Sequence, residues 1–262
     1  MECEILIADP AKNITVFVLD KIEDKKQRSD ISRALLAAPG LHAEQVGFVS
    51  REPWRLEMMG GEFCGNAARS FGLFAAREQG LSGKVSIPIE ISGRHGSLLV
   101  ELDIEEGRAE TEMPIPCFET LEYQGRNLPV LVFEGITHVI AADLIASKEL
   151  FYAIKNRLDT KPSSTPGSAL GVMFYDTPSQ FMTPAVYVEA TDSLVFESSC
   201  GSGSAALGAW LSRDMGEGNA RYEIKQPGGI IEVKVVKNEA KIQNLYIGGK
   251  VTLSGRMRVG VR

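Results

Sequence analysis

Residues 62–72 read EFCGNAARSFG, and residues 198–208 read SSCGSGSAALG. The two stretches align without a gap, 136 positions apart, and share three pairs of identical residues: Cys64 and Cys200, Gly65 and Gly201, Gly72 and Gly208. In each copy a Cys-Gly pair precedes a run of small residues that favours a helix. The repeat therefore predicts two helices, each with a thiol at its N-terminus.

A thiol at a helix N-terminus has a distinctive chemistry. The first N–H groups of a helix have no partner within it, and the helix dipole is positive at that end, so anions bind there. The same field lowers the pKa of a thiol from about 8.5 towards neutrality. We therefore expect Cys64 and Cys200 to have lowered pKa values and to face a bound carboxylate, an arrangement suited to moving a proton.

The repeat continues beyond the cysteines. Glu90 and Gly96 correspond to Glu223 and Gly229, each 133 positions later, within similar strand-rich segments. The spacing from helix to hairpin thus differs by only three residues between the copies. A duplicated unit of about half the chain explains this agreement, and it predicts two similar domains with a cleft between them.

The domain boundary is expected near Pro114 and Pro116, which interrupt the strand pattern. The N-terminal domain, with the first cysteine, is expected to cover residues 1–118. The C-terminal domain, with the second, is expected over residues 119–254. A last strand, about residues 255–262, is expected to pair back onto the first domain.

Composition and charge exclude several classes of protein. With 262 residues, 44% of them hydrophobic, the chain can bury two cores. A net charge of −6 without a basic run argues against a nucleic-acid partner. No apolar stretch reaches the roughly 18 residues of a membrane span, and the initial MECE lacks the features of a secretory signal. We expect a soluble cytoplasmic protein, and the sequence leaves open whether it forms a homodimer.

The cysteines and histidines are too sparse for a disulfide framework or a metal site. The four cysteines form no CxxC pair, and the three histidines show no HxxxH spacing. We expect no metal.

The hydrophobic pattern predicts the remaining elements. Helices are expected over residues 29–38, 64–79 and 144–158, a second cysteine helix after residue 197, and an exposed loop over 162–167. Strands are expected over residues 5–7, 14–19, 45–49, 54–58, 129–142, 173–176 and 185–189, with hairpins within 84–104 and 222–253.

Four interpretations fit the paired cysteines. A thiol hydrolase needs a cysteine in contact with a histidine, such as His138, but has no use for a second equivalent thiol. A disulfide between Cys64 and Cys200 would be reduced in the cytosol. A non-catalytic anion-binding module could use the helix ends alone, with thiols that only pack. Proton exchange at a stereocentre needs two groups of similar acidity on opposite faces of one carbon, and it uses every feature of the repeat.

At these motifs the chain resembles the cofactor-independent amino-acid racemases and epimerases of the diaminopimelate epimerase fold. The resemblance runs across nearly the whole chain, through the turn at Asn13 and the segments 45–48, 64–66, 138–139 and 200–203. Within this family the chain is most similar to the histidine racemases of opine-metallophore pathways, through residues 44–48, 62–67, 199–203 and 226–229.

The resemblance implies a fold and a mechanism. The fold is α/β (α+β), with two pseudosymmetric domains that each wrap a curved, mostly antiparallel sheet or barrel around a central helix. The mechanism needs no cofactor: one cysteine, as thiolate, takes the α-proton while the other, as thiol, delivers a proton to the opposite face. Backbone N–H groups would hold the α-carboxylate and the developing enolate charge at Gly65, Asn66, Gly201 and Ser202.

Four side chains complete the expected substrate-binding set, and three of them also have a purely structural explanation. Glu197 would bind the α-ammonium group, or would only place a carboxylate at a helix entry. Glu44 could face the substrate side chain, or could be a solvated loop carboxylate. Asn13 could bind a ligand or close its own turn, and Gln45 is the fourth member.

Departures from the family pattern bear on the substrate. In diaminopimelate epimerases an arginine follows the glutamate ahead of the second cysteine and grips a distal carboxylate, whereas here Ser198 follows Glu197. Two asparagines that help to bind diaminopimelate are replaced by Ile136 and Ala169. A second carboxylate would be left without partners, at a cost of several kcal/mol.

A single amino acid with a neutral or cationic side chain is therefore the favoured substrate, and histidine is the leading candidate. Two alternatives remain open: a diaminopimelate epimerase with an altered distal pocket, and a non-catalytic amino-acid-binding homologue.

Overall fold

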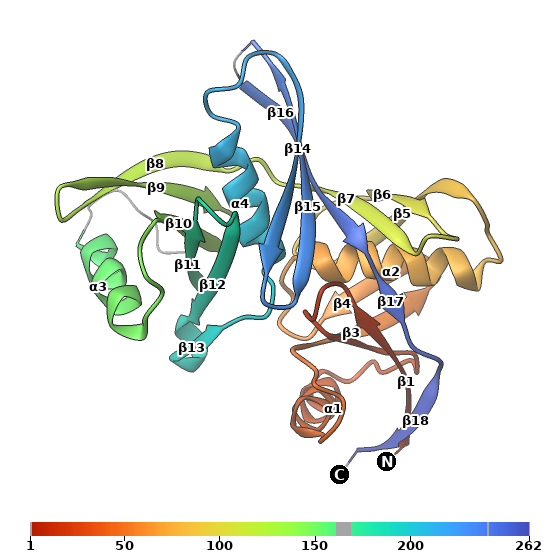
Figure 1. Cartoon of the computed structure of the whole chain (residues 1–262). Coiled ribbons are helices and arrows are strands. Elements are labelled where there is room, and N and C mark those ends of the chain that lie inside the picture. The colour runs from red at the N-terminus through yellow and green to blue at the C-terminus, as the bar shows by residue number, and fades with distance from the viewer. Residues whose placement is uncertain (1, 161–168, 240, 262) are drawn as a thin grey trace. The chain divides into compact units, whose positions relative to one another are not determined.

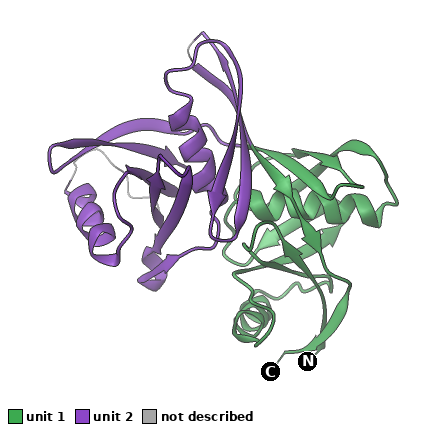
Figure 2. Cartoon of the chain, in the orientation of Figure 1, with its two compact units in different colours: residues 1–112, 247–262 green, residues 113–246 purple. Residues whose placement is uncertain are grey.

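The computed structural model describes residues 2–160, 169–239 and 241–261. The exposed loop predicted over residues 162–167 lies outside them. Two compact units divide the chain: unit 1 comprises residues 1–112 and 247–262, and unit 2 comprises residues 113–246 (Figure 2). The end of the chain thus belongs to the same unit as its beginning.

Unit 1 is a curved sheet with two helices (Figure 1). Its elements are β1 (Glu2–Asp9), β2 (Thr15–Val18), α1 (Lys25–Ala37), β3 (Gln45–Arg51), β4 (Trp54–Met58), α2 (Gly65–Glu78), β5 (Lys84–Ile91), β6 (Leu98–Asp103), β7 (Arg108–Met113), β17 (Thr252–Leu253) and β18 (Met257–Gly260). Consecutive strands from β1 to β7 pair in order, antiparallel except for β2–β3 and β4–β5. Helices α1 and α2 connect these two parallel pairs, as parallel strands require a long crossover.

The C-terminal segment closes this sheet. The strand β16 (Lys241–Lys250) pairs with β7, and β17, which follows it directly, pairs with β1. The last strand, β18, also pairs with β1, from Glu2 opposite Gly260 to Ile5 opposite Met257. The last strand of the chain thus lies beside the first strand.

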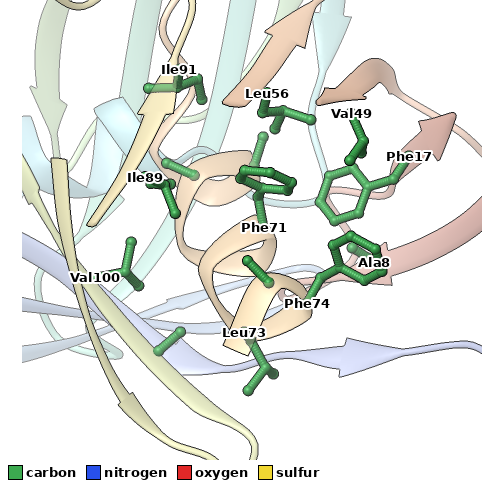
Figure 3. Packing of buried hydrophobic residues seen from close by; sticks show 14 of the residues in the cluster. Ala8, Phe17, Val49, Leu56, Phe71, Leu73, Phe74, Ile89, Ile91 and Val100 are labelled. Atoms are coloured by element: carbon green, nitrogen blue, oxygen red, sulfur yellow. The ribbon is translucent and has the colours of Figure 1, made fainter. Parts of the chain in front are cut away.

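Helix α2 lies at the centre of unit 1, because every residue from Gly65 to Ala76 is buried. A helix that is buried on all sides has protein around it rather than a solvent face. Figure 3 shows Phe71 and Phe74 of α2 packed with Phe17, and the rings of Phe17 and Phe71 lie 5.9 Å apart.

Unit 2 repeats this plan. Its elements are β8 (Cys117–Tyr123), β9 (Arg126–Phe133), β10 (Ile136–Ala142), α3 (Lys148–Asp159), β11 (Ala169–Asp176), β12 (Phe181–Val188), a short 3₁₀ turn (Glu189–Thr191), β13 (Ser193–Phe196), α4 (Gly201–Leu211), β14 (Gly218–Gln226) and β15 (Gly229–Asn238), followed by most of β16. The parallel pairs β10–β11 and β12–β14 are connected by α3 and α4. Helices α1 and α2 connect the corresponding parallel pairs of unit 1. The duplication seen in the cysteine motifs is therefore also present in the order and pairing of the strands and helices.

Two helices begin at residues other than those predicted. Helix α1 begins at Lys25 rather than at residue 29, because Asp24 caps it by accepting a hydrogen bond from the Gln27 amide at 2.7 Å. Helix α3 begins at Lys148 rather than at residue 144, capped by Ser147. None of the helices in the described part of the chain is long and apolar enough to span a membrane.

The shared glycine near the middle of each cysteine helix has a packing role. A Cβ added at Gly72 would lie 2.7 Å from the Val100 side chain on β6, and one at Gly208 would lie closer still to Val233 on β15. Such distances are shorter than any ordinary contact, and valine, being β-branched, cannot easily turn away. Glycine therefore lets each helix approach its sheet.

Gly72→Ala should lower the free energy of unfolding by about 1 to 3 kcal/mol, because the new methyl group overpacks the contact with Val100. Urea denaturation followed by circular dichroism measures this loss. Gly216→Ala is the matched control, since nothing lies within 4 Å of a Cβ there, and a change within about 0.5 kcal/mol is expected. Equal stability of the two variants would contradict the packing argument.

Candidate active site

Cys64 and Cys200 are the N-cap residues of α2 and α4, with nearly identical backbones. Their φ and ψ angles are −127° and 112° for Cys64, and −127° and 115° for Cys200. The Sγ atom of Cys64 accepts a hydrogen bond from the Ala67 amide at 3.5 Å, and that of Cys200 accepts one from the Gly203 amide at 3.4 Å. Each thiol thus takes the place that a serine or aspartate oxygen usually takes at a helix start.

The expectation that the helix ends lower both thiol pKa values is wrong for the free protein. Burial raises the pKa of Cys64 to about 11, and the nearby charge of Glu62 adds to this, while hydrogen bonds from backbone amides and Gln45 oppose it. Burial also raises the pKa of Cys200 well above its usual value, and the charge of Glu197 raises it further. Removing a thiolate from water outweighs the attraction of a helix end, so both groups are thiols at neutral pH.

The site residues expected in the first half of the chain meet beside Cys64 in one hydrogen-bonded network. Asn13, which is buried, donates through Nδ2 to Glu44 Oε2 at 2.6 Å. Its Oδ1 accepts hydrogen bonds from Gln45 Nε2 at 2.9 Å and from Asn66 Nδ2 at 3.1 Å. Three separate segments therefore contribute to one polar cluster: the turn after β1, the start of β3 and the first turn of α2.

Within this network Glu44 is the titratable member. The residue as a whole is exposed, but partial burial of its carboxyl group raises the pKa of that group. The hydrogen bond from Asn13 opposes this shift, and the charge of Asp9 reinforces it. Asp9 is itself paired with Lys12 at 2.8 Å. A carboxylate with a raised pKa at a polar cluster is typical of a functional site.

In unit 2 the start of α4 is held by a glutamine that the sequence analysis did not identify as a site residue. Gln226 Oε1 accepts a hydrogen bond from the Cys200 amide at 2.8 Å, and Gln226 Nε2 donates to Ser204 Oγ at 2.9 Å. Ser204 in turn donates to the Cys200 carbonyl at 2.7 Å. Gln226 belongs to residues 226–229, one of the segments that carry the resemblance to histidine racemases. In the sequence alone, however, a glutamine before Pro227 and Gly228 looks like an ordinary turn residue.

His138 reaches Cys200 only through Ser202. Its Nε2 atom lies 2.9 Å from Ser202 Oγ, which lies 3.6 Å from Cys200 Sγ. The ring is fully buried, and burial lowers the pKa of His138 to about 3, so it is neutral. A thiol hydrolase would need direct contact between cysteine and histidine, and Ser202 separates them here.

Glu197 and Gly201 are the remaining expected site residues of unit 2. Glu197 follows β13 and lies near enough to Cys200 to raise its pKa, and its amide donates to the Pro184 carbonyl at 3.0 Å. Gly201 begins α4 and keeps part of its surface exposed, as Ser202 does. In unit 1 the corresponding Gly65 begins α2 and is buried.

The two positions at which family asparagines are absent are neighbours. Ile136 and Ala169 pair directly across the parallel strands β10 and β11, and both are partly exposed. These two side chains together make a small apolar patch in unit 2. Among the described residues, no group of three histidine, cysteine, aspartate or glutamate side chains is arranged to hold a metal ion.

Comparison with known proteins identifies relatives over the full length of the chain. A family model described as the histidine racemase CntK N-terminal domain matches residues 3–259. A histidine racemase of Fusobacterium nucleatum subsp. nucleatum is 32% identical over 259 residues, which cover 96% of this chain and 94% of that protein.

Solved structures share the fold. A predicted epimerase from Pseudomonas aeruginosa matches with a TM-score of 0.69 at 12% identity, over 98% of this chain and 99% of that one. A hydroxyproline epimerase from Agrobacterium vitis matches with a TM-score of 0.66 at 11% identity, over 98% and 91%. These matches confirm the expected mixed α/β, diaminopimelate epimerase-like fold.

The raised pKa of Cys64 predicts how fast it reacts at different pH. Only the thiolate is alkylated, so the rate of reaction with iodoacetamide should rise about tenfold per pH unit from pH 7 to 10 without a plateau. Peptide mass spectrometry measures the rate at Cys64. An unstructured peptide with one cysteine and blocked ends, whose thiol has a pKa of about 8.5, serves as the control and should level off within this range. A plateau for Cys64 below pH 9 would show that the helix end lowers the pKa of this thiol by more than burial raises it.

Proposed function

Because this chain belongs to the histidine racemase family, we propose that it interconverts L- and D-histidine without a cofactor, with Cys64 and Cys200 as the two bases. One cysteine takes the α-proton as a thiolate, and the other supplies a proton to the opposite face of the same carbon as a thiol. The roles reverse for the other enantiomer.

The observation that carries this proposal is the pair of N-cap thiols. Two cysteines with the same backbone conformation, each at the start of a buried helix, are what a symmetric proton exchange needs. A hydrolase or a simple binding module needs only one such thiol or none. A two-base proton exchange therefore explains why the cysteine helix is present twice.

Formation of the reactive thiolate depends on the bound substrate. Both thiols have raised pKa values, so the thiolate is a minor species in the free protein. The α-ammonium group of an amino acid brings a positive charge, which favours the thiolate over the thiol nearby. Glu197 is proposed to hold that ammonium group.

The helix starts stabilise the charge that develops during the reaction. When the α-proton leaves, negative charge spreads onto the carboxylate, and backbone N–H groups at Gly65, Asn66, Gly201 and Ser202 are proposed to receive it. Fixed donors in a site with little water stabilise such charge more than water does, because they need no reorganisation. They replace the electron sink that a cofactor would provide.

Substrate choice follows from the polar network and the apolar patch. Glu44 is proposed to accept a hydrogen bond from the imidazole, which offers an N–H donor in its neutral and charged forms. Ile136 and Ala169 offer no partner to a second carboxylate but suit the face of a ring. The cytoplasmic location stays a prediction.

Deuterium exchange tests the substrate. In deuterium oxide the protein should introduce deuterium at the α-carbon of L-histidine, measured as loss of the α-proton signal in proton NMR, and form D-histidine, measured by chiral chromatography. We expect exchange with meso-diaminopimelate to be at least about 100-fold slower, because a buried carboxylate without partners costs several kcal/mol. Faster exchange of meso-diaminopimelate would favour an epimerase, and no exchange with any amino acid would favour a binding protein.

Single cysteine variants test the two bases. Cys64→Ser and Cys200→Ser should each reduce racemisation at least about 1,000-fold, because a hydroxyl is far less acidic than a thiol and cannot serve as the base. Circular dichroism should show an intact fold, since the change opens no large cavity. Cys117→Ser, at an exposed cysteine, is the control and should retain full activity. Substantial activity in either site variant would contradict the two-base mechanism.

A further inference from the structure

Arg69 is a fully buried arginine beside the polar network of unit 1. It lies on α2, one turn after Asn66, and none of its surface is exposed. Its Nε atom donates to Asn66 Oδ1 at 3.1 Å, and its Nη1 atom donates to the carbonyls of Gly249 and Lys250 at 3.1 and 3.4 Å. The guanidinium is thus held both by Asn66 and by the C-terminal segment that closes the sheet.

The hydrogen bonds from Arg69 run in one direction through two amides to Glu44. Arg69 donates to Asn66, Asn66 Nδ2 donates to Asn13 Oδ1, and Asn13 Nδ2 donates to Glu44. A guanidinium can only donate, whereas an asparagine amide can present either its oxygen or its nitrogen to a neighbour. Arg69, the first donor in this series of hydrogen bonds, therefore sets the orientation of the Asn66 and Asn13 amides.

Glu44 is the only acceptor-only group of this chain of hydrogen bonds. Ionised carboxylates accept and cannot donate, so a donor held at 2.6 Å favours the ionised form. If Asn13 turned its oxygen to Glu44 instead, the carboxyl would have to carry a proton to make the contact. The orientation of two buried amides thus decides whether Glu44 meets the substrate as an acceptor.

We propose that Arg69 is a positioning residue for the active site, which acts through Asn66 and Asn13 to hold Glu44 as a hydrogen-bond acceptor for the N–H of the substrate side chain. The part of this inference that concerns the substrate rests on the proposed function. The part that concerns Glu44 does not, because the hydrogen bonds exist in the free protein.

Carbon-13 NMR of the free protein tests this role without any substrate. In protein labelled at glutamate carboxyl carbons, the signal of Glu44 is the one absent from Glu44→Gln. We expect its titration midpoint to rise by about one pH unit in Arg69→Met, a tenfold change in the proton dissociation constant. Asn66→Leu, which keeps the charge of Arg69, should give the same rise, and the double variant should add nothing to it.

The comparison of these variants separates the relay from two simpler explanations. If Arg69 acted only through its charge, Asn66→Leu would leave the Glu44 titration unchanged, which would overturn the proposal. Asn66→Leu alone carries the test if Arg69→Met does not fold. Asp9 and its partner Lys12 also carry charges near Glu44. Both residues are the same in every variant, so they do not affect the comparison.

Lys237 supplies the matched control for a buried cation. It is 5% exposed in unit 2 and donates to three backbone carbonyls, those of Ser212, Arg213 and Met215. Lys237→Met should lower stability but leave the Glu44 titration in place, and a shift there would overturn the proposal by showing a general effect of destabilisation.

Activity gives a second measurement. Arg69→Met and Asn66→Leu should raise KM for L-histidine about 10-fold while kcat changes less, because Glu44 contacts the side chain and not the reacting carbon. If the protein lacks racemase activity altogether, the NMR titration still decides the role of Arg69. A lower kcat with unchanged KM would contradict a role through Glu44.

Discussion

The hydrogen bond from a backbone amide to a cysteine sulfur at the start of a buried helix is the interaction on which the rest of this structure depends. It determines where α2 and α4 begin, and it places each thiol at a helix end. In unit 1 the helix that begins at this cap is buried from Gly65 to Ala76. Its small residues allow this burial, because glycine at position 72 lets β6 approach the helix closely.

Central placement of the helices has a consequence for acidity. The positive end of each helix favours a thiolate, but the surrounding protein removes the water that would solvate it, and burial prevails. A base that is protonated at rest is also protected from side reactions, since thiols react far more slowly than thiolates. A ligand that carries its own positive charge can then activate the site on which it binds.

The two units share a backbone plan but surround their thiols with different side chains. Cys64 has beside it a cluster of amides that leads to Glu44, whereas Cys200 has a glutamine that braces the helix start and a serine that connects it to a neutral histidine. Duplication explains the common helices and parallel pairs. Divergence of the side chains fits a substrate with two unlike ends, because only the α-carbon must be approached from two equivalent sides.

The sequence by itself determined the duplication, the two cysteine helices and most strands, because cap residues, small-residue runs and alternating apolar residues act over a few neighbouring positions. It also placed Asn13, Glu44, Gln45 and Asn66 in one expected site by resemblance. Only the tertiary structure decided that these four are joined by hydrogen bonds, that Arg69 is buried behind them, that Gln226 braces Cys200 and that the thiol pKa values rise. The physical reason is that burial and hydrogen-bond direction depend on residues far apart in the chain, such as Arg69 and Gly249, which come together only when the sheet closes.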